Sequence, residues 1–297
     1  MNHIKDQIRC GAAYRLGLTG KGIGVAVLDT GIFLHRDFDS RVTGFADMVN
    51  RRNFAYDDCG HGTHICGIIG GSGRMSGGRY SGIAPGCNLI MVKVLDRKGN
   101  GYSSDVLAGI SWVLERKEQL GIRILNISVG ACSKRGMSEN SALVKGVNRA
   151  WDAGLVVVVA AGNNGPRTMS ITTPGISRKV ITVGCSDDDR EVLVGGNRMV
   201  DYSGRGPTAA CICKPDLVAP GCSVVSCSSR ADKYTIKSGT SMSTPIVSGA
   251  VALLLERFPD MSNKDVKLRL RESSVDIGLP RNQQGWGMLN VEKMIGK

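Results

Sequence analysis

Short runs of β-branched and other apolar residues alternate along this 297-residue chain with segments of helical periodicity. Because these runs are almost continuously apolar, we expect each to form a strand that is buried on both faces of a sheet. The alternation favours an α/β fold, a three-layer open parallel sheet with helices on both faces. The predicted strands cover Ile23–Leu28, Asn88–Leu95, Ile122–Val129, Leu155–Ala161 and Lys179–Gly184, and the predicted helices cover Ser104–Gln119, Glu139–Ala153, Ser241–Phe258 and Asn263–Ser273.

No Pro-rich or Ser-rich linker and no internal repeat interrupts this pattern, which predicts one domain over residues 1–297. The longest apolar runs, such as Leu155–Ala161, are far shorter than the roughly 18 residues that span a bilayer. The first residues also lack the apolar core and small-residue cleavage site of a secretion signal. The sequence therefore predicts a soluble, cytoplasmic protein with no membrane partner, unless the chain is the mature fragment of a secreted one.

The chain is basic, with 38 Lys and Arg against 26 Asp and Glu and a net charge of +12. A clustered positive charge would favour nucleic acid or acidic substrates as partners. Here the basic residues are scattered along the sequence, which indicates a solvated surface. We expect no nucleic-acid partner.

The ten cysteines include no CxxC pair, and Cys211 and Cys213 are too close together and too isolated for a zinc site. Most of the others lie within or beside apolar segments, as Cys66 and Cys185 do, where cysteine acts as a small buried hydrophobe. We expect reduced thiols and no disulfide framework.

Polar residues follow the predicted strands at their carboxyl ends, where ligands bind in open parallel sheets. Asp29 closes the first strand and precedes Gly31, at a point where the chain must turn sharply. His61 opens a predicted helix in "HGTHICGIIGG". His64 follows three residues later, but the HExxH arrangement of a zinc site is absent, so we predict acid–base chemistry and no metal.

Two further candidates complete a possible nucleophilic site. Asn163 follows the strand Leu155–Ala161, and its amide has the uncharged donor that an oxyanion site requires, although Asn164 qualifies equally on composition. Ser241 stands at the start of a helix whose N–H groups and dipole favour a nearby anion. Helix capping is the alternative role for a serine there. We predict that Ser241 reacts and that its neighbouring hydroxyls cap.

Five motifs carry a resemblance to the subtilisin-like serine proteases, the subtilase or peptidase S8 family. The candidates occur in the family's order, Asp then His then Ser, and the motifs span essentially the whole chain. Within this family, the chain resembles the intracellular, AprX-like members. The motifs are "VAVLDTGI" around Asp29, "HGTHICGII" around His61, "LNISVG" at Leu125–Gly130, "VVAAGNNGP" around Asn163 and "SGTSMSTPIVSGAVALL" around Ser241.

The resemblance implies a serine endopeptidase that hydrolyses proteins or peptides through an acyl-enzyme intermediate. Ser241 would attack the scissile carbonyl, His61 would take and return the proton, and Asp29 would orient the imidazole. Asn163 and the backbone N–H of Ser241 would stabilise the oxyanion.

The resemblance also implies a substrate-binding region with broad side-chain preference, because an extended substrate would pair through its backbone. Thr172 matches a position at the floor of the pocket for the residue before the cut, where the family often has Gly. Either the pocket is shallower here or the loop runs differently, and the sequence favours neither. The residues implied in binding the substrate are Gly99, Asn100, Gly101, Ser128, Val129, Gly130 and Thr172.

The sequence differs from the family pattern in three places, each of which leads to an expectation. Cys66 lies close behind His61, where an exposed thiol would give sensitivity to mercurials and a packed thiol, which we expect, would be inert. Ser243 stands where Ala is usual. The segment Gly70–Tyr80 offers few of the oxygen ligands of the family's calcium loop, and Asp37 alone matches a ligand. We therefore predict no calcium there and no cofactor.

Other functions are less consistent with these residues. A pseudoprotease that only binds partners would not need every reactive position, yet all are intact. A dinucleotide-binding oxidoreductase is suggested by "GKGIG" at Gly20–Gly24, but that run precedes its strand, which excludes the phosphate-binding geometry. Nucleic-acid binding rests on net charge alone.

Overall fold

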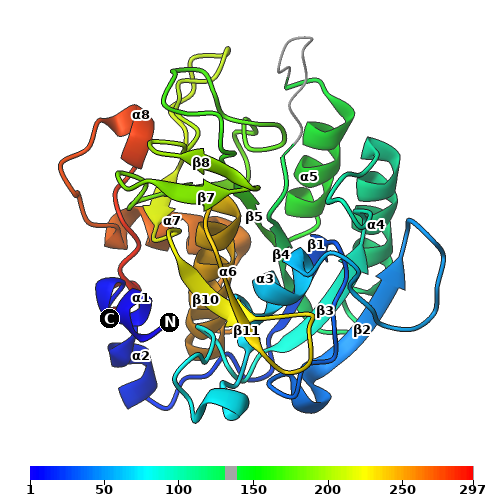
Figure 1. The fold of residues 1–297 in the computed structure, drawn as a ribbon. Coiled ribbons are helices and arrows are strands. Elements are labelled where there is room, and N and C mark those ends of the chain that lie inside the picture. Colours follow the sequence, from blue (N-terminus) through cyan, green and yellow to red (C-terminus); the bar gives the residue numbers. More distant parts are fainter. Residues whose placement is uncertain (131–138, 297) are drawn as a thin grey trace.

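The computed structural model describes residues 1–130 and 139–296 and contains a parallel seven-stranded sheet of order β2-β3-β1-β4-β5-β6-β9 (Figure 1). Every pair of neighbouring strands in this sheet is parallel, which confirms the predicted fold class. The strands are β1 Gly24–Asp29, β2 Val42–Asp47, β3 Asn88–Lys93, β4 Ile122–Ile127, β5 Val156–Ala160, β6 Ile181–Cys185 and β9 Leu217–Ala219.

The central strands form because their β-branched side chains are buried on both faces of the sheet. Every residue of β1, β5 and β6 is buried. The five predicted strands are present, with ends that differ by at most two residues from the predicted bounds. The edge strand β2 was not predicted, because its residues are mostly only half-buried and carry no continuous apolar run.

Helices cover both faces of the sheet and complete the three layers (Figure 1). Helices α3 (His61–Gly70) and α6 (Thr240–Arg257) contact each other and one face. Helices α4 (Ser103–Arg116) and α5 (Ala142–Asp152) contact each other and the other face. Residues 242–255 of α6 are all buried, because this helix lies against β4, β5 and β6 and is covered by α3.

Smaller elements surround this framework. The short helices α2 and α9 are in contact, which places the two ends of the chain side by side (Figure 1). The hairpin of β10 and β11 lies over α3. These elements are α1 Asn2–Gln7, α2 Gly11–Arg15, α7 Asn263–Ser273, α8 Arg281–Gln284, α9 Val291–Ile295, the 3₁₀ turns Asp39–Arg41 and Arg74–Ser76, and the strands β7 Val192–Val194, β8 Asn197–Met199, β10 Val224–Cys227 and β11 Tyr234–Lys237.

The strand order reverses at β1, which lies between β3 and β4. At such a switch point the loops that follow neighbouring strands separate and leave a crevice at the carboxyl edge. Gly31, just beyond β1, has a φ of +120° and forms an antiparallel bridge with Asp57. A Cβ there would lie 2.1 Å from the carbonyl oxygen of Tyr56, so only glycine allows this contact. The bridge holds the segment before α3 against the end of β1.

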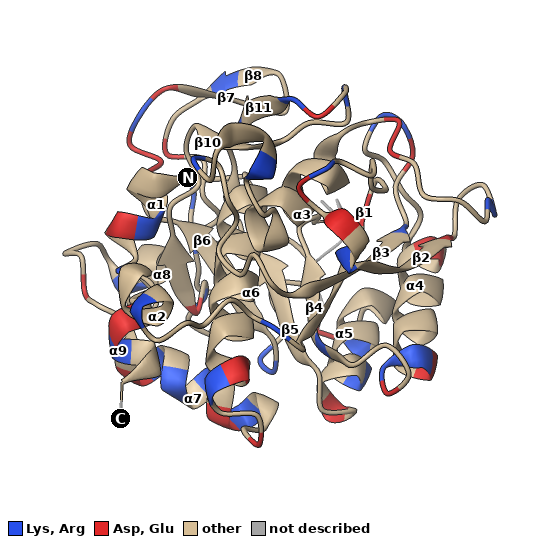
Figure 2. Cartoon of the chain, turned by 90° about the horizontal axis from the view of Figure 1, so that it is seen from below, with Lys and Arg blue, Asp and Glu red and all other residues tan. Residues whose placement is uncertain are grey.

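Charged side chains of both signs are interspersed over several elements, for example on α7 and α9 (Figure 2). Across residues 1–130 and 139–296, no helix combines the length and the apolar character that crossing a membrane requires.

Candidate active site

Asp29 and His61 are brought into direct contact at the carboxyl edge of the sheet. The Nδ1–H of His61 donates to both oxygens of Asp29, at 2.7 Å and 2.9 Å. Asp29 is fully buried at the end of β1, whereas the side chain of His61, the first residue of α3, is 23% exposed. The backbone N–H of Thr30 also donates to Asp29, at 2.8 Å. The imidazole is therefore held in one tautomer, with its Nε2 unprotonated when the ring is neutral.

The pKa of His61 results from two opposing effects. Burial by itself lowers the pKa, because it disfavours the charged imidazolium. The charge of Asp29 and its hydrogen bond outweigh burial, so the pKa of His61 is raised above its ordinary value of 6.5. This arrangement favours an imidazole that accepts a proton and holds it beside a carboxylate.

Asp57 ties the turn before His61 to the end of β1. Its carboxylate accepts hydrogen bonds from the hydroxyl of Thr30 at 2.9 Å, from the N–H of Gly60 at 2.7 Å and from the hydroxyl of Thr63 at 2.6 Å. Gly60, with a φ of +88°, is the N-cap of α3. Asp57 thereby orients the first turn of the helix that carries His61. The motif "YDDCG" contains this residue, but its role requires contacts that the sequence does not specify.

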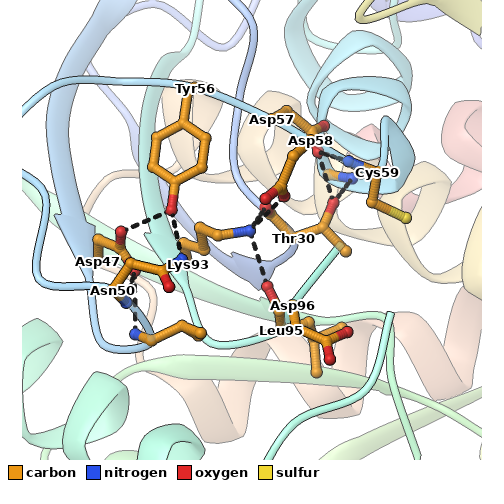
Figure 3. A network of polar contacts seen from close by, with 12 residues as sticks. Thr30, Asp47, Asn50, Tyr56, Asp57, Asp58, Cys59, Lys93, Leu95 and Asp96 are labelled. Atoms are coloured by element: carbon orange, nitrogen blue, oxygen red, sulfur yellow. Dashed lines mark hydrogen bonds and ion pairs between the residues drawn. The ribbon is translucent and has the colours of Figure 1, made fainter. Parts of the chain in front are cut away.

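The buried ammonium of Lys93 joins three segments of the site (Figure 3). It donates to the carbonyl of Thr30 at 2.5 Å, to the carbonyl of Leu95 at 2.9 Å and to Asp58 Oδ1 at 2.7 Å. Its side chain is fully buried, and Nζ lies 5.0 Å from the ring centroid of Tyr56. One cation thus links the loop after Asp29, the turn before His61 and the segment that follows β3 at Leu95. The available sequence signal was a lysine within the apolar run Asn88–Leu95.

Ser241 is the second residue of α6 and is partly exposed. Its hydroxyl donates to the carbonyl of Ser128 at 2.8 Å. Among the described residues no hydrogen bond joins Ser241 to His61, but both side chains line one cavity of about 450 Å³. Rotation about one side-chain torsion redirects the Oγ, and hydrogen bonds of this kind often form only when substrate is bound.

Asn163, just beyond β5, is oriented by a residue of α6. Its Oδ1 accepts hydrogen bonds from the backbone N–H and the hydroxyl of Thr240, both at 3.0 Å. This fixes which side of the amide carries the oxygen and leaves the Nδ2 donor on the opposite side. Asn163, Asn164 and Ser241 all line the 450 Å³ cavity. Thr240, which immediately precedes Ser241, therefore positions Asn163. This is a structural role, as we expect for the hydroxyls next to Ser241.

The predicted substrate-binding residues lie around this cavity and the pocket next to it. The neighbouring pocket, of about 210 Å³, is lined by both predicted substrate-binding segments together with apolar residues such as Val106 and Ile127. The 450 Å³ cavity is lined by Gly99, Ser128, Val129, Gly130 and Thr172, and the smaller pocket by Gly99, Asn100, Gly101, Val129 and Gly130.

Thr172 fills the space between two glycines at the base of the cavity. A Cβ on Gly130 would lie 2.2 Å from Thr172 Oγ1, and one on Gly162 would lie 2.4 Å from its Cγ2. The Thr172 hydroxyl donates to the carbonyl of Ala161 at 3.2 Å, and Thr172 is almost fully buried. The side chain is thus fixed in place and occupies volume that a glycine would leave open.

Several polar residues near the motifs are structural. His64 is buried, its Nε2–H donates to the carbonyls of Val224 and Thr235, and burial lowers its pKa to about 3. Cys66 is fully buried, and burial raises the pKa of its thiol. Both observations favour a packed, unreactive thiol over an exposed one that mercurials would attack. The hydroxyl of Ser243 is buried and has no hydrogen-bond partner among the residues that the structure describes.

Asp37 does not have the environment of a calcium ligand. Its carboxylate oxygens accept hydrogen bonds from the N–H of Met75 at 2.9 Å and the hydroxyl of Tyr234 at 2.7 Å. Calcium requires six to eight oxygen ligands, whereas N–H and O–H donors occupy this carboxylate. These residues do not fit the family's calcium site.

Comparison with known proteins places this geometry in a family. The model of the Subtilase family, Peptidase_S8, matches residues 20–287. The chain is 42% identical to Serine protease AprX of Bacillus subtilis (strain 168), over 99% of this chain and 70% of that protein. It is 34% identical to Subtilisin BL of Lederbergia lenta, over 97% of this chain and 96% of that one.

Solved structures agree with the sequence comparisons. Sphericase superposes with a TM-score of 0.77 at 31% identity, over 92% of this chain and 93% of its own. A cold adapted subtilisin-like serine proteinase superposes with a TM-score of 0.75 at 28% identity, over 92% of this chain and 90% of its own. The chain therefore belongs to the subtilase family and is a subtilisin-type serine endopeptidase that acts on protein substrates.

Proposed function

We propose that this endopeptidase cleaves peptide bonds through a triad of Asp29, His61 and Ser241. The observation that carries the proposal is the buried Asp29–His61 hydrogen bond, which opens onto the same cavity as Ser241. Such a constellation supplies a nucleophile, a base and a group that orients the base.

The proposed reaction begins with the transfer of the Ser241 proton to Nε2 of His61. The Ser241 hydroxyl turns from the Ser128 carbonyl toward the imidazole, and its Oγ attacks the scissile carbonyl carbon. Asp29 stabilises the imidazolium that forms, and His61 then donates the proton to the leaving amine. Water hydrolyses the resulting acyl-enzyme with His61 again as base.

Asn163 and the backbone N–H of Ser241 are proposed to stabilise the oxyanion. The orientation of the Asn163 amide supports this role, because Thr240 occupies its oxygen and leaves Nδ2 to donate. The N-terminus of α6 adds the positive end of a helix dipole beside the same site.

The substrate is proposed to be an extended segment of a protein that pairs with residues 99–101 and 128–130. The position of both segments along the cavity and its neighbouring pocket supports this binding mode. We further propose that hydrolysis needs no cofactor and no calcium at residues 70–80, which the hydrogen bonds to Asp37 support. Neither nucleic acid nor a membrane is part of the proposal.

The proposal is tested by replacing Ser241 with Ala. Casein is digested with each protein, and the peptides are identified by mass spectrometry. We expect Ser241→Ala to lower kcat by about 10⁶-fold, the loss that removal of this serine causes in subtilisin. A fluorophosphonate probe should label the wild-type chain at residue 241, because only an activated hydroxyl reacts with it.

Ser243→Ala is the matched control for this experiment. It removes a buried hydroxyl two residues away that has no hydrogen-bond partner in the described part of the chain, so activity and labelling should stay close to wild type. A wild-type chain that neither cleaves casein nor reacts with the probe would identify a pseudoprotease.

A second prediction concerns pH. Because the pKa of His61 is raised above 6.5, kcat/KM should fall as pH decreases through that higher value, where the imidazole becomes protonated and cannot accept the Ser241 proton. In Asp29→Asn, burial still disfavours the imidazolium but the carboxylate no longer stabilises it, so the pKa of His61 should fall. The acid limb of the kcat/KM profile should therefore move to lower pH. The rate should fall by about 10⁴-fold.

NMR titration of the imidazole signals in a Ser241→Ala background measures the same shift without autolysis. His64 is an internal reference, because its pKa of about 3 keeps it neutral near pH 7. An Asp29→Asn variant in which His61 titrates at the same pH as before would contradict the assigned contact.

A third prediction separates the two neighbouring asparagines. Asn163→Ala should lower kcat by about 10²–10³-fold at nearly constant KM, because the donor acts on charge that develops in the transition state. Asn164→Ala is the control and should have a much smaller effect on steady-state hydrolysis of a chromogenic peptide. The reverse ranking would assign the oxyanion donor to Asn164.

A fourth prediction concerns the pocket at Thr172. We propose a shallow pocket, because the Thr172 side chain fills the gap between Gly130 and Gly162. Among peptides with Ala, Leu or Phe before the cut, the wild type should not favour Phe. Thr172→Gly should raise kcat/KM for the Phe peptide about 10-fold relative to the Ala peptide, since pocket differences of this size are worth about 1–3 kcal/mol. A clear preference of the wild type for Phe would show that the loop binds differently.

A further inference from the structure

Cys185, Asp187 and Cys222 bring two thiols and a carboxylate together behind the start of α6. One ligand atom from each residue lies within 4.8 Å of the other two. Cys185, at the end of β6, is buried, whereas Asp187 and Cys222 are partly exposed. The hydroxyl of the buried Tyr202 lies 3.2 Å from the sulfur of Cys185 and 3.1 Å from that of Cys222. We refer to the first three residues as the thiol cluster.

The chemistry of the thiol cluster suits a thiophilic divalent cation. Zinc binds cysteine sulfur at about 2.3 Å and carboxylate oxygen at about 2.0–2.2 Å in tetrahedral geometry, which separates its ligand atoms by roughly 3.5–3.8 Å. The present spacing includes 3.1 Å between Cys185 Sγ and Asp187 Oδ1, so only small side-chain shifts are needed. The partial exposure of Asp187 and Cys222 gives the cluster contact with solvent, from which a water would supply the fourth ligand.

We propose that the thiol cluster is a binding site for Zn²⁺, distinct from the catalytic residues, and that its occupation slows peptide hydrolysis. On binding, the thiols of Cys185 and Cys222 become thiolates and release two protons to solvent, and no electron is transferred. The hydroxyl of Tyr202 then donates a hydrogen bond to one of the thiolates. This inference goes beyond the proposed function, because binding of the cation requires no catalytic step.

A short path of hydrogen bonds connects the thiol cluster to Ser241. Asp187 Oδ1 accepts from the N–H of Gly221 at 2.7 Å and from the N–H of Cys222 at 3.1 Å. The carbonyl of Gly221 accepts from the N–H of Gly239 at 3.0 Å, and Gly239 is the N-cap of α6. A cation bound to Asp187 Oδ1 competes with the N–H of Gly221 for this oxygen and weakens their hydrogen bond. The start of α6, which carries Ser241, then loses part of its support.

A second group of possible ligands, His35, Asp37 and Cys227, is less suited to a cation. All three residues are buried, so an ion would have no access to them from solvent. The thiol cluster has two sulfurs instead of one and is open to solvent at two of its members.

Cadmium is the probe for the test, because thiolate–Cd²⁺ bonds absorb in the ultraviolet and report the ligands directly. The reference protein carries Ser241→Ala to prevent autolysis and has serine at Cys59, Cys211 and Cys213, which are at least partly exposed, and at Cys132, which lies outside the described residues. We expect one Cd²⁺ per chain, thiolate absorption and two protons released. Zn²⁺ should displace the Cd²⁺.

Cys222→Ser in this reference should weaken binding by at least about 100-fold, because even partners that only support a ligand contribute 10–100-fold. Asp187→Asn is a second variant with both thiols intact and should weaken binding without abolishing the absorption. Cys227→Ser is the matched control and should bind as the reference does. Circular dichroism verifies that each variant is folded. Binding that survives Cys222→Ser, or that is lost with Cys227→Ser, would overturn the proposal.

The effect on hydrolysis is measured in the same cysteine background with Ser241 restored. Zn²⁺ should lower kcat more than it raises KM, EDTA should restore the rate, and Cys222→Ser should abolish the inhibition. Inhibition that persists in Cys222→Ser, or that a thiol reductant reverses and EDTA does not, would overturn the proposal. Because cation binding is measured with Ser241→Ala, its absence refutes this inference and leaves the proposed function untouched.

Discussion

The hydrogen bonding of β1 to β3 on one side and to β4 on the other is the constraint on which the site depends. This pairing fixes Asp29 at the carboxyl end of a fully buried strand, in register with Lys93 of β3. The strand order reverses at β1, so the loops after β1, β4 and β5 end around one crevice. Asp29, Ser128 and Asn163 come from these three strand ends, and α3 and α6 add His61 and Ser241 from one face.

Two buried ions at this crevice require compensation, since an unpaired buried charge is strongly destabilising. Asp29 receives hydrogen bonds from His61 and from the Thr30 backbone. Lys93, its neighbour in the sheet, donates to Thr30, Leu95 and Asp58 and packs against Tyr56 (Figure 3). The bonds that satisfy Lys93 also fix the positions of the chain segments around Asp29 and His61. The same hydrogen bonds therefore compensate the buried charge of Lys93 and hold Asp29 and His61 in position.

The start of α6 is supported from two directions. On the cavity side, Thr240 orients Asn163, and the Ser241 hydroxyl contacts the Ser128 carbonyl. Behind it, Gly239 is bonded to Gly221, which Asp187 holds. In the proposed inhibition, a change at Asp187 reaches Ser241 through these backbone contacts without any group entering the cavity. This gives the thiol cluster a physical route to influence hydrolysis.

The sequence alone determined the layered α/β fold, because hydrophobic periodicity is local and records burial on both faces of the central strands. It also singled out Asp29, His61, Asn163 and Ser241 through motifs in a fixed order. Strand β9 is only three residues long and shows no such periodicity. Strand β2 lies at the edge of the sheet, so most of its residues are only half-buried and its sequence has no continuous apolar run. Only the tertiary structure decided that Lys93 supports the site, that His64 is a buried structural group and that Asp37 is occupied by Met75 and Tyr234. These outcomes depend on contacts between residues far apart in the chain, and a local pattern does not specify which distant donor or acceptor a side chain meets.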